Sequence, residues 1–229
     1  MPDVLAQPSS TRPGFGRPLA FLAGVGVMVI AVSGPLDIRA EQRLSWHMVQ
    51  HLMLISIAAP MLALGRPAQL ASRLAVRHPL RERSLGPSAA AGAAATALAV
   101  LFTWHLPVLY QLALRHEQVH AVEHLTLVGS SMLLWHALLE ARHFGAGALW
   151  VYLVTLPMTA FGVAMTIART PWYRPYVHGD AGAAVRDQQL AGVIMWGFGG
   201  LVAVASAVAL FAMWLMRLET PRPGMRSLP

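Results

Sequence analysis

The stretch WHMVQHLMLISIAAPMLALGRP, residues 46–67, decides the fold. It is apolar and long enough to span a bilayer as one helix. His47 and His51 stand four residues apart at its start, so a helix would carry both imidazoles on one face, a turn apart. Ionisable side chains in a membrane segment are costly and usually face a protein interior, a partner or an ion. The pair is therefore a candidate functional site.

The composition is that of a membrane protein. Of the 229 residues, 56% are hydrophobic and 12% are charged, whereas an ordinary soluble domain has about 25% charged residues. The apolar runs predict an all-α integral membrane bundle of about six transmembrane helices, lying in the lipid bilayer. The spans cover about residues 18–35, 46–67, 88–106, 119–139, 148–168 and 190–216.

The domain organisation follows from these runs. We expect a disordered N-terminal tail at 1–17, a six-helix transmembrane domain at 18–216 and a C-terminal tail at 217–229. The first run could be a signal peptide, but its length favours a retained helix. We expect polar loops between the spans, including one before residue 46, one with Tyr110 and Arg115, and one at 169–189.

The arginines predict the orientation. The sequence has no Lys, and with six spans 11 Arg fall on the side of both termini and 6 on the other. Five of the 11 lie in the loop at 66–87. Because cytoplasmic loops are rich in basic residues, we expect cytoplasmic termini and a multi-pass protein of a bacterial cytoplasmic (inner) membrane. Topology also explains the net charge of +7, so we expect no nucleic-acid partner.

Antiparallel packing of these spans gathers histidines at the outer face. Seven of the ten histidines then lie on or near it: His47 and His51 in the second span, His105 at the end of the third, His116, His120 and His124 around the start of the fourth, and His178 in the last loop. His78, His136 and His143 fall toward the inside, and we interpret His136 and His143 as structural.

Such an arrangement is suited to a metal ion. Imidazole binds copper, zinc, iron and nickel, and two HxxxH pairs with a histidine from a third helix could converge on one ion. Glu123 would be a ligand or would orient an imidazole. A lone interfacial histidine is more often a hydrogen-bonding residue, so the hypothesis depends on the two pairs lying at one depth. The sequence has no Cys, which excludes thiolate sites.

Other chemistry is weakly indicated. HAVEH at 120–124 lacks the residue order of the zincin motif HExxH, and we find no serine-centred elbow, so we predict no enzyme. The spans lack the inverted repeats of many transporters. Asp187 is interpreted as a helix N-cap, and the tyrosines and tryptophans of the 169–189 loop as anchors at the membrane interface.

Five stretches carry a resemblance to a known family: SGPLD at 33–37, WHMVQHLMLISIAAPMLALGRP at 46–67, WHLPVLY at 104–110, HAVEHLTL at 120–127 and DQQLAGVIMWGFGG at 187–200. With these motifs the chain resembles the multi-span CtaG-type assembly factors of caa3-type cytochrome c oxidase. The resemblance implies a role in maturing a haem–copper oxidase by delivering or inserting copper at the CuB site of its catalytic subunit. Periplasmic copper chaperones are further candidate partners.

The resemblance also implies a ligand set. The histidines that fall in the matching motifs carry over as copper ligands: His47, His51, His105, His120 and His124. His116 and His178 lie outside the motifs and are left out. Two alternatives stay open: a membrane cytochrome that binds haem b through pairs of histidines, and a structural assembly scaffold that binds no metal.

Overall fold

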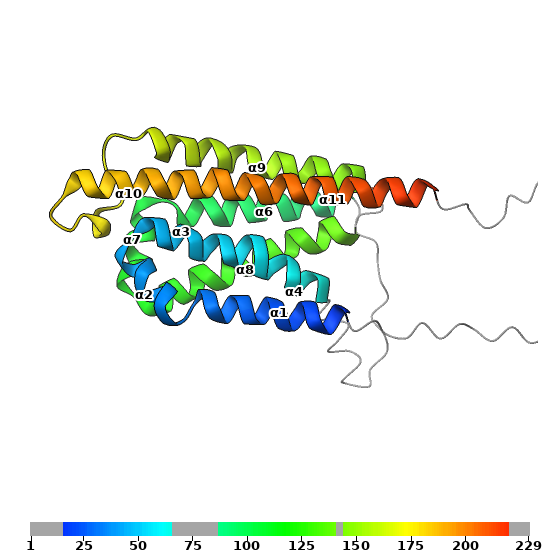
Figure 1. Cartoon of the computed structure of the whole chain (residues 1–229), viewed down its shortest axis with the longest axis horizontal. Coiled ribbons are helices and arrows are strands. Elements are labelled where there is room, and N and C mark those ends of the chain that lie inside the picture. The colour runs from blue at the N-terminus through cyan, green and yellow to red at the C-terminus, as the bar shows by residue number, and fades with distance from the viewer. Residues whose placement is uncertain (1–15, 66–86, 141–143, 220–229) are drawn as a thin grey trace, which may run out of the picture.

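The computed structural model describes residues 16–65, 87–140 and 144–219, and these residues form helices and connecting turns (Figure 1). Several predictions lie wholly or mostly outside the described residues: the tail at 1–17, the arginine-rich loop at 66–87, the end of the tail at 217–229, and His78 and His143.

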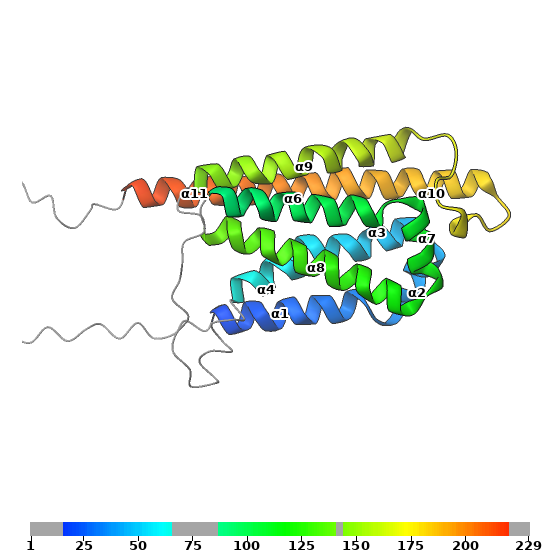
Figure 2. The same ribbon diagram turned by 180° about the vertical axis from the view of Figure 1, so that it is seen from behind.

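The first half of the described chain contains α1 (Gly16–Ala31), α2 (Gly34–Gln42), α3 (Leu44–Leu52), the π-helix η1 (Met53–Ala58), α4 (Ala59–Gly65), α6 (Pro87–Trp104) and α7 (Pro107–Arg115). The second half contains α8 (Glu117–Glu140), α9 (Phe144–Ile167), the 3-10 helix η2 (Arg174–Tyr176), α10 (Ala181–Val193), the π-helix η3 (Ile194–Phe198) and α11 (Gly199–Glu219). The long helices lie side by side, while α2 and α7 gather at one end of the bundle, here called the α2–α7 end (Figures 1 and 2).

Membrane-spanning segments can be assigned by length and composition. In the described ranges, Leu44–Gly65, Gly147–Ile167 and Ala181–Met216 are long and apolar enough to cross a membrane. Their number rises from 3 to 5 if two bent pairs, α1 with α2 (47°) and α6 with α7 (71°), each count as one span. The predicted span at 119–139 forms α8, which is not among these segments but packs against α6 and α4. A helical membrane bundle is thus supported, while six spans and cytoplasmic termini stay predictions.

Three segments expected as loops are helical. The polar stretch before residue 46 forms α2, the stretch after residue 106 forms α7, and the last long helix begins at Ala181 rather than near residue 190. The predicted helices begin at the first apolar residue of each run and so leave out polar turns whose Ala, Gln and Arg residues are good helix formers.

The expectation that Asp187 caps a helix is wrong. Asp180 is the N-cap of α10, and its carboxylate accepts hydrogen bonds from the backbone N–H groups of Gly182 and Ala183 at 2.8 and 3.0 Å. Asp187 lies well inside α10, where it accepts a 2.6 Å hydrogen bond from Ser45 Oγ of α3. This residue therefore ties two helices together near His47.

Small residues let helices approach closely. A Cβ atom on Gly192 of α10 would lie 2.5 Å from the carbonyl oxygen of Gly162 in α9 and 2.6 Å from Oγ1 of Thr166. A Cβ atom on Gly65 of α4 would lie 2.6 Å from Cβ of Phe21 in α1. Close contact of this kind is how helices associate in a membrane, where apolar burial gives little driving force.

Candidate metal centre

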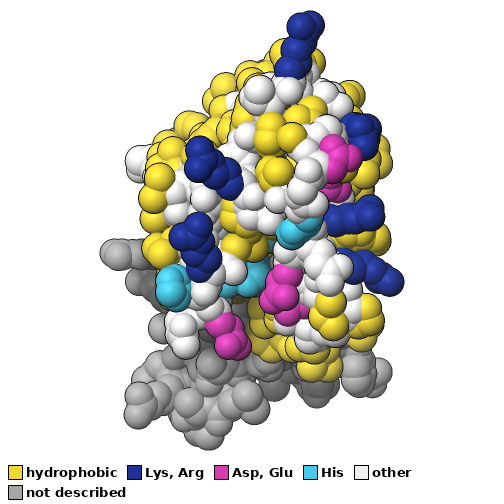
Figure 3. Space-filling view, turned by 90° about the vertical axis from the view of Figure 1, so that its left-hand side faces the viewer, with side chains coloured by type: hydrophobic (Ala, Val, Ile, Leu, Met, Phe, Trp, Pro, Cys, Tyr) yellow, Lys and Arg dark blue, Asp and Glu magenta, His cyan; other side chains and the backbone are white. Residues whose placement is uncertain are grey.

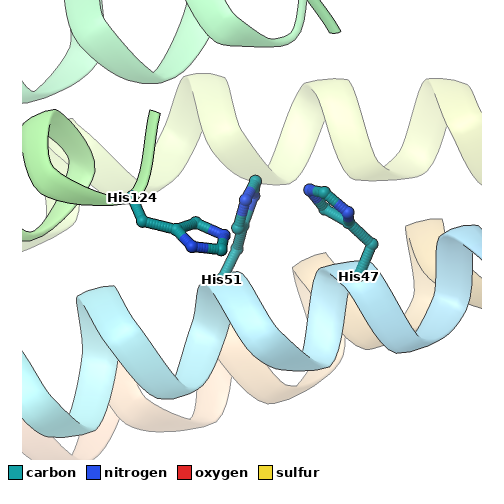
Figure 4. A group of neighbouring side chains, drawn as sticks. All are labelled: His47, His51 and His124. Carbon is teal, nitrogen blue, oxygen red and sulfur yellow. The ribbon is translucent and has the colours of Figure 1, made fainter. Parts of the chain in front are cut away.

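The five predicted histidine ligands lie together at the α2–α7 end and are called the histidine cluster: His47, His51, His105, His120 and His124. Helix α3 carries the first two on successive turns, α8 carries the last two in the same way, and the remaining one follows α6 directly. Figure 4 shows three members from α3 and α8 pointing toward one another. The structure thus brings the predicted residues together, and metal binding by them stays a prediction.

The distances within the histidine cluster are short. The ring centroids of each i, i+4 pair lie 4.2 Å apart. Between the helices, His47 lies 5.4 Å from His120, and His51 lies 5.4 Å from His124 and 6.3 Å from His105. The histidine cluster therefore reaches across three helices without an intervening side-chain layer.

Among the described residues, two sets of three side chains bring their ligand atoms close enough together to hold a metal ion. One ligand atom from each of His47, His51 and His124 lies within 4.8 Å of the other two, and the same is true of His47, His120 and Glu123. Ligand atoms bound to one ion at about 2 Å lie about 3–4 Å apart, so small side-chain rotations would close either set.

The ligand atoms are buried and lack protein partners. Every member of the histidine cluster except His120 is buried, and Glu123 beside them is fully buried. Within the described part of the chain, Nε2 of each of the five imidazoles and both carboxylate oxygens of Glu123 have no hydrogen-bond partner. Glu123 Oε1 lies 3.6 Å from His51 Nε2, which is within the range of an ion pair but too long for a hydrogen bond. Because buried polar groups are normally paired, this arrangement fits a bound cation.

Hydrogen bonds on the far side of two rings set their tautomers. Tyr176 donates its hydroxyl proton to the carbonyl oxygen of Ala40 at 3.1 Å, so its oxygen can accept from Nδ1–H of His47 at 3.3 Å. His105 donates Nδ1–H to the carbonyl oxygen of Leu101 at 2.8 Å. We infer that Nε2 of both rings keeps its lone pair and faces the histidine cluster, as a metal ligand must.

Three tyrosines cover the histidine cluster, and this position was not predicted from the sequence. Tyr110 is fully buried, with its ring centroid 4.9 Å from that of His47 and its hydroxyl 3.3 Å from that of Tyr176. Tyr173 donates a 2.9 Å hydrogen bond to the carbonyl oxygen of His105. Burial raises the pKa of Tyr173 and Tyr176 above the ordinary value, so both keep their protons.

The interpretation of the tyrosines in the 169–189 loop as interface anchors is wrong, because Tyr173 and Tyr176 are only 2% and 6% exposed. They pack in an apolar core with Leu44 and Met48 of α3 rather than facing lipid headgroups. The available signal was their position in a loop on the same predicted side as the histidines.

The remaining histidines in the described ranges lie outside the histidine cluster. His116, His136 and His178 are exposed, which agrees with leaving the first and last of them out of the ligand set. Acidic groups lie close by: Asp37 and Glu41 of α2 are near enough to His120 to act on its charge. Figure 3 shows histidine and acidic side chains together on this end of the molecule.

Comparison with known proteins agrees with the motifs. The chain matches the family described as cytochrome c oxidase caa3 assembly factor (Caa3_CtaG) over residues 5–217, which is nearly its whole length. Searches of curated proteins and of solved structures gave no match. The resemblance inferred from the five stretches is confirmed: this chain belongs to the family of caa3-type cytochrome c oxidase assembly factors.

Proposed function

We propose that this assembly factor binds copper in the histidine cluster and passes it to the CuB site of the catalytic subunit of a haem–copper oxidase. Family membership gives the oxidase as partner. The observation that carries the proposal is the convergence of buried imidazole Nε2 atoms without hydrogen-bond partners. Copper is then the cargo of the protein rather than a resident cofactor, and the chain is not an enzyme.

The donor set supports copper. Imidazole nitrogen suits Cu, Zn, Fe and Ni, and among these metals the haem–copper oxidase partner favours copper. The absence of Cys removes thiolate donors, which would hold copper more tightly. Release to another protein favours such a moderate donor set.

The position of the histidine cluster supports delivery from outside the cell membrane. With cytoplasmic termini, the α2–α7 end faces the periplasm of a bacterial inner membrane, where copper chaperones could supply the ion. A lateral transfer to the oxidase would then stay within the outer part of the bilayer, and the protein would not need to carry copper across the membrane.

The haem alternative fits the geometry less well. Two histidines that hold haem b lie on opposite faces of a flat macrocycle. Here the ring centroids of each pair are 4.2 Å apart, and the rings of His51 and His124 meet edge to face with centroids 5.4 Å apart. This packing favours a single ion. An optical spectrum decides, because stoichiometric haem would give a Soret band in the purified protein.

The direct test is anaerobic titration of the purified full chain with Cu(I), using a chromophoric chelator as competitor. We expect the wild type to bind copper and the double variant H47A/H51A to lose binding. The double variant H136A/H178A is the matched control, since it removes two exposed histidines outside the histidine cluster. Wild-type protein that binds no copper would overturn the proposal and favour the scaffold alternative.

A second test measures assembly of the oxidase in cells. Cells that lack this protein are complemented with each variant, and the copper content and activity of the purified oxidase are measured. We expect H47A/H51A to fail and H136A/H178A to restore both. Full restoration by H47A/H51A would show that oxidase assembly does not need the histidine cluster.

A further inference from the structure

We propose that the histidine cluster holds one copper ion in either of two overlapping positions that share His47. The outer position consists of His47, His120 and Glu123, and the inner position consists of His47, His51 and His124. The inference rests on the proposed function, because it takes copper as the cargo, and it adds the route by which the ion moves through the site.

The two positions adjoin. Each has three ligand atoms within 4.8 Å of one another, and His47 belongs to both. The non-shared ligands are close as well, since Glu123 Oε1 lies 3.6 Å from His51 Nε2. His120 and His124 occupy successive turns of α8, with ring centroids 4.2 Å apart. An ion can therefore move between the positions by a short displacement.

Only one position can be filled at a time. Nδ1 of His47 is engaged by Tyr176, which leaves Nε2 as the one lone pair that the ring can offer. A single lone pair binds a single ion. The two positions are thus alternatives, and the protein should bind one copper ion rather than two.

The difference in exposure between the histidines indicates which position a copper ion enters first. His120 is half-buried and stands near the start of α8, where the negative charges of Asp37 and Glu41 of α2 act on it. His51 and His124 lie one helical turn further along their helices and are 3% and 9% exposed. His120 is the one member of the two positions that is not buried, whereas Glu123 of the outer position is 0% exposed. A copper ion from solvent therefore meets His120 first and enters the outer position through it, and the acidic side chains of α2 favour the approach of a cation.

Transfer is a ligand exchange at constant oxidation state. The bond from copper to His47 Nε2 persists, the bonds to His120 and Glu123 break, and bonds to His51 and His124 form. No electron moves, and the ion is never without a protein ligand. The mixed nitrogen and oxygen set at the outer position thus gives way to three imidazoles, which bind copper more tightly than carboxylate does.

The test separates uptake from equilibrium binding. Full-length wild type, H120A, H51A and H47A are loaded anaerobically with Cu(I), with H178A as the control for an exposed histidine. Stoichiometry and affinity come from chelator competition, and uptake rates come from stopped-flow mixing with a Cu(I)–chelator complex. H51N and H120N repeat the test with side chains closer in size to histidine.

The two-position arrangement predicts different defects for the variants. H120A keeps one ion per chain at near wild-type affinity but takes it up about ten-fold more slowly. H51A takes copper up quickly but binds it about ten-fold more weakly or worse. H47A loses both properties. Adding E123Q should weaken binding further in H51A and leave H120A unchanged, and X-ray absorption of copper-loaded H51A should show an oxygen ligand.

Two results would overturn the inference: two copper ions per wild-type chain, or equal changes in rate and affinity for H120A and H51A, which indicate one undivided site. Either result leaves copper binding itself intact. Absence of copper from the wild type would instead refute the proposed function, so the two failures can be told apart.

Discussion

The substitution Tyr176→Phe tests whether the tyrosine cover prepares the histidine cluster for metal. The hydroxyl of Tyr176 donates to the carbonyl oxygen of Ala40 and lies 3.3 Å from Nδ1 of His47 and from the hydroxyl of Tyr110. Phenylalanine keeps the ring that packs in the apolar core and removes these hydrogen bonds. The variant therefore acts on the tautomer of His47 rather than on the ligand itself.

The expected loss of copper affinity follows from the polar groups that the substitution leaves without a hydrogen-bond partner. A buried donor or acceptor without a partner costs about 1–3 kcal/mol. Without Tyr176, the hydrogen bond that favours a proton on Nδ1 of His47 is gone, and the tautomer with the proton on Nε2 removes the lone pair that faces the histidine cluster. Loss of a partner behind a metal-bound histidine typically costs about 10–100-fold in affinity, or about 1.4–2.8 kcal/mol. We expect Y176F to weaken Cu(I) binding within that range.

The assay is the chelator competition at fixed pH, combined with ¹⁵N NMR of the His47 ring to assign its tautomer. Tyr173→Phe is the matched control, because its hydroxyl comes from the same loop but donates to the backbone oxygen of His105 at 2.9 Å and touches no ring nitrogen. Equal affinity losses for Y176F and Y173F, or an unchanged tautomer in Y176F, would refute the reasoning.

Two further predictions concern the bundle. Gly192→Ala places a methyl group 2.6 Å from Oγ1 of Thr166 and should lower the free energy of unfolding by about 1–3 kcal/mol. Gly197→Ala is the control, because no heavy atom lies within 4 Å of the added methyl group. Equal melting temperatures of the two variants in detergent would contradict this prediction. Ser45→Ala removes a 2.6 Å hydrogen bond to the carboxylate of Asp187 and should lower the free energy of unfolding by about 1.5–3 kcal/mol. Each kcal/mol should lower Tm by about 2–4 °C. Thermal unfolding monitored by circular dichroism checks it, and an unchanged Tm would count against this tie between α3 and α10.

The gathering of histidines was predictable from the sequence because it depends on two simple periods. Four-residue spacing places His47 and His51, and likewise His120 and His124, on one helix face. Antiparallel order brings the ends of neighbouring spans to one depth. What the sequence could not give is helix rotation, so it predicted that the pairs lie at one level but not which side chains face each other.

Other features could not be predicted from the sequence because they depart from the regular 3.6-residue period of an α-helix. The π-helix η1 starts at Met53, directly after the α3 pair, and shifts the register of the residues that follow. Within η1, the carbonyl oxygen of Ile55 accepts a 3.2 Å hydrogen bond from Trp135 Nε1 of α8. A uniform 3.6-residue period assigns the wrong faces beyond that point. The contacts of Tyr176 escaped for a different reason, since they join positions 129 and 136 residues apart.

The broken helices at the α2–α7 end explain how the histidine cluster is oriented. Proline ends one helix and starts the next in both bent pairs, with Pro35 in the first turn of α2 and Pro107 in that of α7, because proline has no N–H for an intrahelical bond. Each helix end leaves backbone carbonyls available to other donors.

The carbonyl that acts on His47 lies at a further break, between the end of α2 at Gln42 and the start of α3 at Leu44. Ala40 near the end of α2 accepts from Tyr176, which frees the phenolic oxygen for His47. Leu101 in the last turn of α6 accepts from the backbone N–H of His105 at 3.1 Å, as in a regular helix, and also from its ring at 2.8 Å. In an α2 continuous with α3, the carbonyl oxygen of Ala40 would be used mainly by the helix, and Tyr176 would lose the acceptor that frees its own oxygen for Nδ1–H of His47. The break between α2 and α3 therefore helps to select the tautomer of His47 that turns Nε2 toward the histidine cluster, whereas the ring of His105 uses a carbonyl that its helix also uses.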